Sequence, residues 1–278
     1  MKKLLLVALM AGAIGSLAYG RNQEIIYIDN SVSIAYQVLN FNYVEPSDTC
    51  ALGICSNATS SGYFDRELGN INGVRLSASQ LDMGIHFYGR IAYRRAQGYV
   101  KYQGYSQAGT PIPNGVSGAN IAGYSVRLGP VLSSGRVMAI PFVQYGHHAW
   151  SRVVGVGTSA SYEEDYQNQY FGFGALFQVA MTRILVGSLY AMAGQTLNPS
   201  ISVPSLGFAQ PLGAAPLVKA GVLLNLRLSR LFGLYAGVRY VRFSYGQSPT
   251  EQSGSLTVME PASNTVMTSY EGGLRFFF

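Results

Sequence analysis

The chain ends in VMTSYEGGLRFFF, Val266–Phe278, and this stretch decides the fold. Successive side chains of a β-strand point to opposite faces, so alternate residues of such a stretch share a face. One face is mostly apolar or aromatic and holds Val266, Thr268, Tyr270, Gly272, Leu274, Phe276 and Phe278. The other face holds both charges, Glu271 and Arg275. The stretch therefore predicts an amphipathic strand at the end of the chain.

The start of the chain resembles a bacterial export signal. Lys2 and Lys3 precede an apolar run from residue 4 to residue 14, and the small residues Ala18 and Gly20 have the spacing that a signal peptidase recognises. The apolar run is well short of the ~20 residues that a helix needs to cross a bilayer. We therefore predict a signal peptide over residues 1–20 and one domain over residues 21–278.

Composition narrows the fold class. Only 12% of the residues are charged, and the chain holds 33 glycines and 20 tyrosines. The long uncharged stretch 184–218 is interrupted by four prolines and predicts no spanning helix. Because every backbone polar group must be paired inside lipid, only helices and closed barrels span a membrane. The absence of spanning helices favours an all-β, closed antiparallel transmembrane barrel.

These features resemble the outer-membrane β-barrel proteins of Gram-negative bacteria, in particular the small surface barrels of the OmpA and Opa type. The terminal strand of such proteins ends in Phe, after alternating apolar or aromatic positions that the barrel-assembly machinery recognises. Four residues match that pattern: Tyr270, Leu274, Phe276 and Phe278. Gly272 departs from it, and Phe277 adds an aromatic side chain to the inner face. The resemblance implies outer-membrane lipid, lipopolysaccharide and the assembly machinery as partners.

The same alternation recurs along the chain and predicts ten strands, with eight or twelve left open and a soluble β-sandwich as the less favoured fold. The predicted ranges are 28–43, 69–81, 85–96, 119–132, 137–151, 169–181, 184–196, 217–228, 232–245 and 264–278. Short connections alternate with long ones at 44–68, 97–118, 152–168, 197–216 and 246–263, as in barrels with tight periplasmic turns and long outer loops. Residues 98–105 either extend a strand beyond the membrane or add a hairpin.

Basic residues fall on the predicted inward faces. We expect a lumen network of Arg75, Arg90, Arg127, Lys219, Arg227, Arg239 and Arg275, with Glu271 as the acid among them. A barrel of about ten strands is little wider than one that side chains fill, so a plugged or very narrow lumen is expected. The network is structural or contacts anions. Because the basic residues are spread over many strands, nucleic acid is not an expected partner despite the net charge of +6.

Acidic residues fall mostly in the predicted outer loops: Glu45, Asp48, Asp65, Glu67, Glu163, Glu164, Asp165, Glu251 and Glu260. Carboxylates beside an anionic leaflet bind divalent cations, so these loops could bridge to lipopolysaccharide phosphates. The two cysteines, Cys50 and Cys55, share the first outer loop, and export favours a disulfide between them. Two thiols without a nearby His make a poor metal site, so we predict neither a metal nor a cofactor.

We predict a non-enzymatic protein that presents loops, supports the envelope or mediates adhesion through an extracellular ligand. A narrow porin-like channel for small solutes is the alternative. An enzyme is less favoured, although His147, His148 and Ser151 lie near a predicted rim, with the acidic run Glu163–Asp165 in the loop that follows. Rim His and aromatic residues are also typical of the interfacial girdle of a barrel.

Overall fold

Ten long antiparallel strands form one closed barrel in the computed structural model, which describes residues 22–46, 62–105, 111–158, 161–253 and 256–278. The barrel strands are β1 Ser31–Pro46, β2 Tyr63–Asp82, β3 Phe87–Tyr105, β4 Pro111–Pro130, β6 Val137–Val154, β7 Tyr162–Ala180, β8 Leu185–Val203, β10 Pro216–Arg227, β11 Phe232–Tyr245 and β14 Ser263–Phe277. Neighbours in the chain are neighbours in the wall, and the first and last strands, β1 and β14, pair to close it. The predicted fold class and strand number are confirmed.

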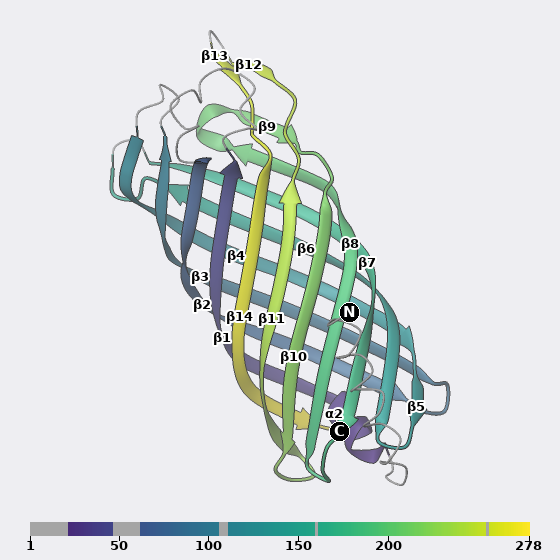
Figure 1. Cartoon of the computed structure of the whole chain (residues 1–278). Helices are drawn as coiled ribbons and strands as arrows, with labels where there is room; N and C mark the ends of the chain where they lie inside the picture. The colour runs from purple at the N-terminus through teal and green to yellow at the C-terminus, as the bar shows by residue number, and fades with distance from the viewer. Residues whose placement is uncertain (1–21, 47–61, 106–110, 159–160, 254–255) are drawn as a thin grey trace, which may run out of the picture.

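Short elements accompany the barrel strands. They are the helix α2 Gln23–Asp29, the 3-10 turn η2 Pro204–Leu206 and the strands β5 Leu132–Ser134, β9 Phe208–Pro211, β12 Glu251–Ser253 and β13 Leu256–Val258. The pairs β8–β9 and β12–β13 extend two outer connections, at the end of the barrel opposite α2 (Figure 1). None of the helices in the described ranges is both long and apolar enough to cross a membrane.

Three of the tight turns at the α2 end use the same local hydrogen bonding. The side-chain oxygens of Asp82, Thr182 and Ser229 each accept backbone N–H groups two and three residues further on. Such side chains replace a backbone acceptor and hold the chain in a turn. This chemistry explains why the predicted short connections lie where the structure has them.

Large apolar side chains cover a band on the outer surface of the barrel. Exposed members include Val32, Ile34, Tyr36, Val74, Leu76, Phe87, Ile91, Tyr93, Phe171, Phe173, Phe177, Val222, Leu224, Leu234, Val238, Tyr270, Leu274 and Phe276. Further along the same strands, away from α2, polar side chains join the exposed outward positions, among them Asn72, Arg95, Gln97, Gln167, Gln195 and Arg242, while Leu68, Tyr99 and Leu197 remain as exposed apolar residues. A band of this composition is what hydrocarbon requires, and the polar residues mark where it ends.

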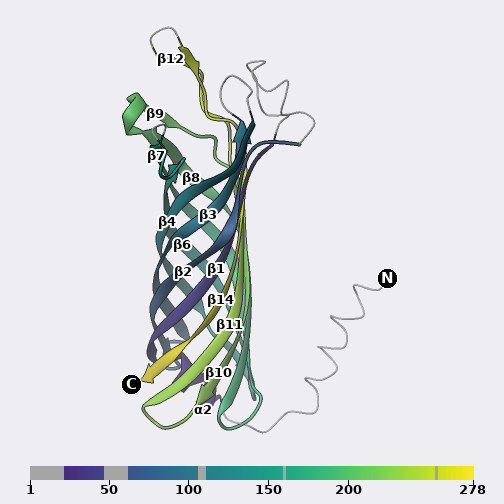
Figure 2. The same ribbon diagram turned by 90° about the vertical axis from the view of Figure 1, so that its left-hand side faces the viewer.

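The strands continue well beyond this band. A membrane strand needs about 9 to 11 residues, whereas β2 and β4 have 20 each. The predicted outer connections are therefore too long, since β2 begins at Tyr63, β7 at Tyr162, and β3 continues to Tyr105. The extension of β3 is the strand extension expected for residues 98–105, and its partner is β4. The outer ends of these strands are thus a paired wall that continues past the apolar band, at the end of the barrel opposite α2 (Figure 2).

The first predicted strand is wrong at its start. Ile28 and Asp29 end helix α2, and β1 begins at Ser31. The helix lies inside one end of the barrel, where Ile25 and Ile28 are almost fully buried and α2 contacts β2, β7, β8 and β14. Alternation could not reveal this, because a seven-residue segment satisfies strand and helix patterns alike.

Candidate functional site in the barrel interior

Two of the predicted lumen cations hold helix α2 in place. Arg275 donates to the carbonyl oxygen of Ile28 at 2.7 Å. Arg227 lies 3.8 Å from the carboxylate of Glu24 and packs over the ring of Tyr27. These contacts and the buried isoleucines fill the lumen at this end of the barrel.

The basic layer occupies the middle of the interior, and we define it as Arg75, Arg90, Arg94, Arg127, Lys219, Arg239 and Glu271. Its one carboxylate, Glu271, is shared by two guanidinium groups, at 3.0 Å from Arg75 and 2.7 Å from Arg239. Because β2 and β11 carry these arginines on either side of the β1–β14 pair, the contact ties the closing strands together. Part of the predicted network is therefore a structural ion triad.

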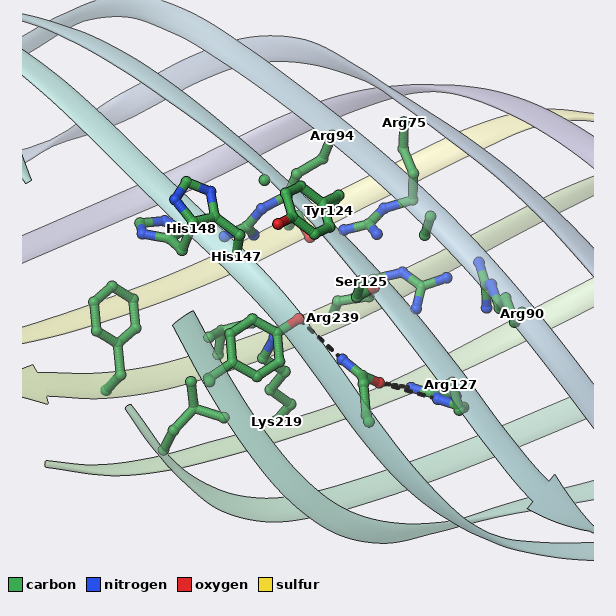
Figure 3. Close-up of a pocket in the computed structure, with 18 of the residues that line it drawn as sticks. Arg75, Arg90, Arg94, Tyr124, Ser125, Arg127, His147, His148, Lys219 and Arg239 are labelled. Atoms are coloured by element: carbon green, nitrogen blue, oxygen red, sulfur yellow. Dashed lines mark hydrogen bonds between the residues drawn. The ribbon is translucent and has the colours of Figure 1, made fainter. Parts of the chain in front are cut away.

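Arg127 makes a second network on the opposite wall. Its Nε and Nη2 donate to Oε1 of Gln144 at 3.0 and 2.9 Å, and Gln144 donates to the hydroxyl of Tyr170. The guanidinium also lies 4.0 Å from the ring centroid of Phe142. Lys219 lies 3.4 Å from the ring centroid of Tyr170. Figure 3 shows Arg127 and Lys219 beside one cavity, which Gln144 and Tyr170 also line and whose volume is about 60 Å³.

The acidic layer lies further out, and we define it as Glu45, Asp65, Glu67, Glu164 and Glu260 around Arg152. The guanidinium of Arg152 bonds to Glu164, lies 2.9 Å from Asp65, and lies 3.4 Å from both Glu45 and Glu67. Glu260 accepts a hydrogen bond from the hydroxyl of Tyr166, which also contacts Glu164. All six side chains of the layer are buried.

Aromatic rings pack with the acidic layer and fill the width of the barrel. Trp150 stacks on Tyr166 at 4.9 Å between ring centroids and lies edge-on to Tyr43 at 4.8 Å. Tyr166 also stacks on Tyr245, whose hydroxyl donates to Asn168. These residues come from β1, β6, β7 and β11, which lie on different sides of the wall. The layer therefore closes the lumen above the basic cavity.

Burial changes the proton affinity of the acidic layer, which lies beyond the apolar band. It raises the pKa of Glu67 and of Glu260 to about 8 and that of Asp65 to about 6, with Arg152 opposing the rise. The pKa of Glu45 also rises well above its usual range, because burial and Asp65 both disfavour its charge. Glu67 and Glu260 therefore hold protons near neutral pH. Within the described ranges, no group of His, Cys, Asp and Glu side chains is arranged to hold a metal ion.

The structure corrects the assignment of acids to outer loops. Glu45, Asp65, Glu67 and Glu164 lie on strands and face the interior, where alternation along longer strands directs them. Only Glu163 and Asp165 of the predicted acidic run face outward on β7. Cys50, Cys55 and Asp48 lie outside the described residues, as does the predicted signal peptide.

The rim residues considered for catalysis are divided between the two faces of β6. His148 is buried in the interior against Phe243, whereas His147 stacks on Tyr124 on the outer surface. Ser151 faces outward and donates to Glu163 at 2.6 Å. The structure therefore does not bring the two histidines and the serine together.

The terminal strand has the faces that its sequence predicts. Tyr270, Leu274, Phe276 and Phe278 are exposed on the outer surface, and Phe277 is buried. Sequence analysis missed Arg152 and Trp150 as central interior residues. Both lie on the even-numbered face of β6 with His148, and extending that alternation past the predicted strand end would have placed Arg152 inside.

Comparison with known proteins identifies the fold of the chain but neither a family nor a function. No family model and no curated protein matches the chain. The outer membrane protease OmpT from Escherichia coli is similar in structure, with 9% identity and a TM-score of 0.56 over 93% of this chain and 100% of that one. The translocator domain of the autotransporter NalP from Neisseria meningitidis has 13% identity and a TM-score of 0.37 over 100% of this chain and 95% of that one. This chain therefore has the fold of the outer-membrane β-barrel proteins.

Proposed function

We propose that this chain is a non-enzymatic surface protein of the outer membrane, with an occluded lumen and a projecting outer wall that contacts lipopolysaccharide and external partners. The observation that carries the proposal is the contrast between a filled interior and strands that extend beyond the apolar band. Loops and rims supported by a rigid scaffold commonly carry binding functions.

Occlusion of both ends supports a surface role over a solute channel. Helix α2 fills one end, and the aromatic rings around Trp150 fill the section beyond the basic layer. A barrel of about this size has little interior space beyond its side chains, which favours an occluded lumen over a continuous aqueous path for solutes. The narrow porin-like channel is accordingly the weaker proposal.

Outward cations support contact with the phosphates of lipopolysaccharide. Arg95, Lys101 and Arg242 are exposed on the outer surface, beyond the aromatic residues of the band. Guanidinium and ammonium groups at this level meet the anionic head groups of the leaflet. The exposed acids Glu163 and Asp165 could add bridges through divalent cations. Export through the signal peptide and recognition of Tyr270, Leu274, Phe276 and Phe278 by the assembly machinery complete this proposal.

Liposome swelling tests the occluded lumen. Vesicles that contain the folded barrel should swell in small sugars or amino acids no faster than empty vesicles, while a general porin serves as the positive control. A variant without the aromatic fill, Trp150→Ala with Tyr166→Ala, should increase swelling if the barrel still folds. Rapid swelling with the unmodified barrel would favour the channel.

Lipopolysaccharide retained on the purified barrel tests the surface contact. The triple variant Arg95→Gln, Lys101→Gln and Arg242→Gln should retain less than half as much as the unmodified barrel, because each lost cation removes a charge-assisted contact. The matched control is Arg136→Gln, Arg183→Gln and Arg230→Gln, which removes the same charge at the opposite end. Equal losses in both variants would refute a site-specific contact.

Absence of catalysis is also testable. Replacing His147 and His148 with Ala should leave lipid A structure and peptide processing unchanged in cells that produce the barrel, because no catalytic group is removed. Loss of a lipid A modification or of a peptide cleavage in the variant would make the protein an enzyme.

A further inference from the structure

The geometry points to a binding site for a small tetrahedral oxyanion, of the phosphate or sulfate class, in the cavity of the basic layer. This inference goes beyond the proposed surface function, since it concerns the closed interior of the barrel. It rests on a charge imbalance, on unpaired donors and on the size of the cavity.

The basic layer carries more positive charge than its surroundings neutralise. Five guanidinium groups and the side-chain amine of Lys219 line the cavity, the guanidinium groups being those of Arg75, Arg90, Arg94, Arg127 and Arg239. Glu271 pairs with Arg75 and Arg239, and no other carboxylate of the described residues lies within ion-pair distance of the cavity arginines. Guanidinium groups do not release their protons in proteins. Because buried unpaired charge is costly, a counter-ion would stabilise this layer.

Unpaired donors show where such an ion would bind. Nη1 of Arg127 and Nη2 of Arg239 are buried without a hydrogen-bond partner in the described structure. These groups project from β4 and β11, which lie on opposite sides of the ten-strand wall. Among the described residues, the hydrogen-bond acceptor of Arg94 is the sulfur of Met267, at 3.8 Å. Figure 3 shows these arginines arranged around the same space.

The cavity size selects among anions. A volume of about 60 Å³ exceeds what one water requires, roughly 10 to 15 Å³, and suits a small inorganic ion. A phospholipid or lipopolysaccharide head group cannot pass the closed wall with its acyl chains attached. Guanidinium forks match the paired oxygens of phosphate and sulfate, and they bind a spherical halide less specifically. A free oxyanion is therefore the occupant that the site fits.

Closure of both ends predicts slow exchange, so the ion should enter as the barrel folds. The test unfolds the full chain in urea and refolds it into detergent with radiolabelled inorganic phosphate, at an ionic strength held constant with chloride. Gel filtration then separates free phosphate, and the label that remains is measured per folded chain. We expect stoichiometric retention, which sulfate in the refolding buffer prevents and added lipopolysaccharide does not.

Two adjacent residues of β3 provide a matched pair of variants. Arg94 lines the cavity, whereas Arg95 is exposed on the outer surface. Arg94→Gln should weaken phosphate retention by at least about tenfold, because it removes a charged donor without breaking an ion pair. Arg95→Gln removes the same charge and should retain phosphate like the unmodified barrel.

Several outcomes would overturn the site. The unmodified barrel could retain no phosphate, chloride could displace the label as well as sulfate does, or Arg94→Gln could retain as much as Arg95→Gln. Displacement of the label by lipopolysaccharide would place the phosphate on the outer surface instead. If Arg94→Gln does not fold, Lys219→Met replaces it, and the unmodified barrel alone still decides retention.

Discussion

The acidic and basic layers are neighbours in one lumen, yet their charges are arranged in opposite ways. In the acidic layer one arginine, Arg152, pairs with four carboxylates. In the basic layer one carboxylate, Glu271, pairs with two of the arginines. Both layers are enclosed by the wall, and the basic layer borders a cavity of about 60 Å³. The comparison therefore isolates how a barrel tolerates excess buried charge of each sign.

Excess buried negative charge and excess buried positive charge are neutralised in different ways. Carboxylates can take up protons, and burial raises the pKa of Glu67 and Glu260 to about 8, so the acidic layer can neutralise itself. Guanidinium groups have no such option, because they keep their protons at all physiological pH values. The basic layer must instead obtain negative charge from outside the chain, and the empty space beside Arg94 and Arg127 is where an anion fits. A lumen of this kind binds protons in one section and an anion in the next.

Arg152→Met should give the largest effect, since it removes the only cation of the acidic layer. We expect a loss of about 3 to 5 kcal/mol in the free energy of unfolding, as for other buried charges deprived of their partner. The loss should shrink at pH 5, which lies below the raised pKa values of Asp65, Glu67 and Glu260. Urea titrations of the barrel folded in detergent measure it, with Arg95→Met as the control. A loss below about 1 kcal/mol would show that Arg152 does not organise the layer.

Glu271→Gln should have the next largest effect, because Arg75 and Arg239 then lose their shared carboxylate. The expected loss is about 3 kcal/mol and, unlike that of Arg152→Met, it should not depend on pH between 5 and 9. Phosphate in the refolding buffer should restore part of it. Outward Glu163→Gln is the control for removing one negative charge. A strongly pH-dependent loss would mean that the two layers are not independent.

The third largest effect should be the pH dependence of the unfolding free energy of the unmodified barrel, which reports on the acidic layer and not on the basic layer. A pKa that rises on folding gives stability that is complete below the unfolded pKa and is lost as the pH passes the folded value. For Glu67 and Glu260 the unfolded value is 4.5 and the folded value about 8, so stability should fall between these limits. The fall should be on the order of 2 kcal/mol, since the coupled acids share protons.

A double variant identifies the groups responsible for that fall. Glu67→Gln with Glu260→Gln removes both titrating carboxyls and should flatten the profile of unfolding free energy between pH 5 and 8. Glu163→Gln with Asp165→Asn, on the outer surface, should leave the profile unchanged. An unaltered slope in the first variant would assign the titration to other groups.

How much the sequence could predict differs between the wall and the interior. Alternation fixed the faces of the wall, because a strand has a period of two and lipid demands apolar side chains on one side. Glu271 and Arg275, on the predicted inward face, are both buried. It failed where strands leave the membrane, since outward residues there are as polar as inward ones. Glu45, Glu67 and Glu164 were therefore assigned to loops.

The interior could be predicted only in part, because its contacts join residues far apart in the chain. The basic lumen followed from counting inward cations, but the pairing of Arg239 with Glu271 depends on β11 lying beside β14. Arg152 meets Asp65 across 87 positions of sequence, a contact that barrel curvature brings about. The plug helix α2 was missed for a simpler reason, since seven residues carry too little periodicity to classify.

His147→Ala should give the smallest loss of unfolding free energy, because its ring stacks on the outer surface of the barrel. His147 faces outward and stacks on Tyr124, with ring centroids 5.5 Å apart, although both residues also border the basic cavity. Loss of one such ring pair should cost about 0.5 to 1.5 kcal/mol. A double-mutant cycle with Tyr124→Ala measures the coupling, and Gln169→Ala, at the paired position on β7, is the control. Because the stacked rings lie on the outer surface, phosphate retention and the pH profile should both be unchanged; a change in either would mean that the outer surface communicates with the lumen through β6.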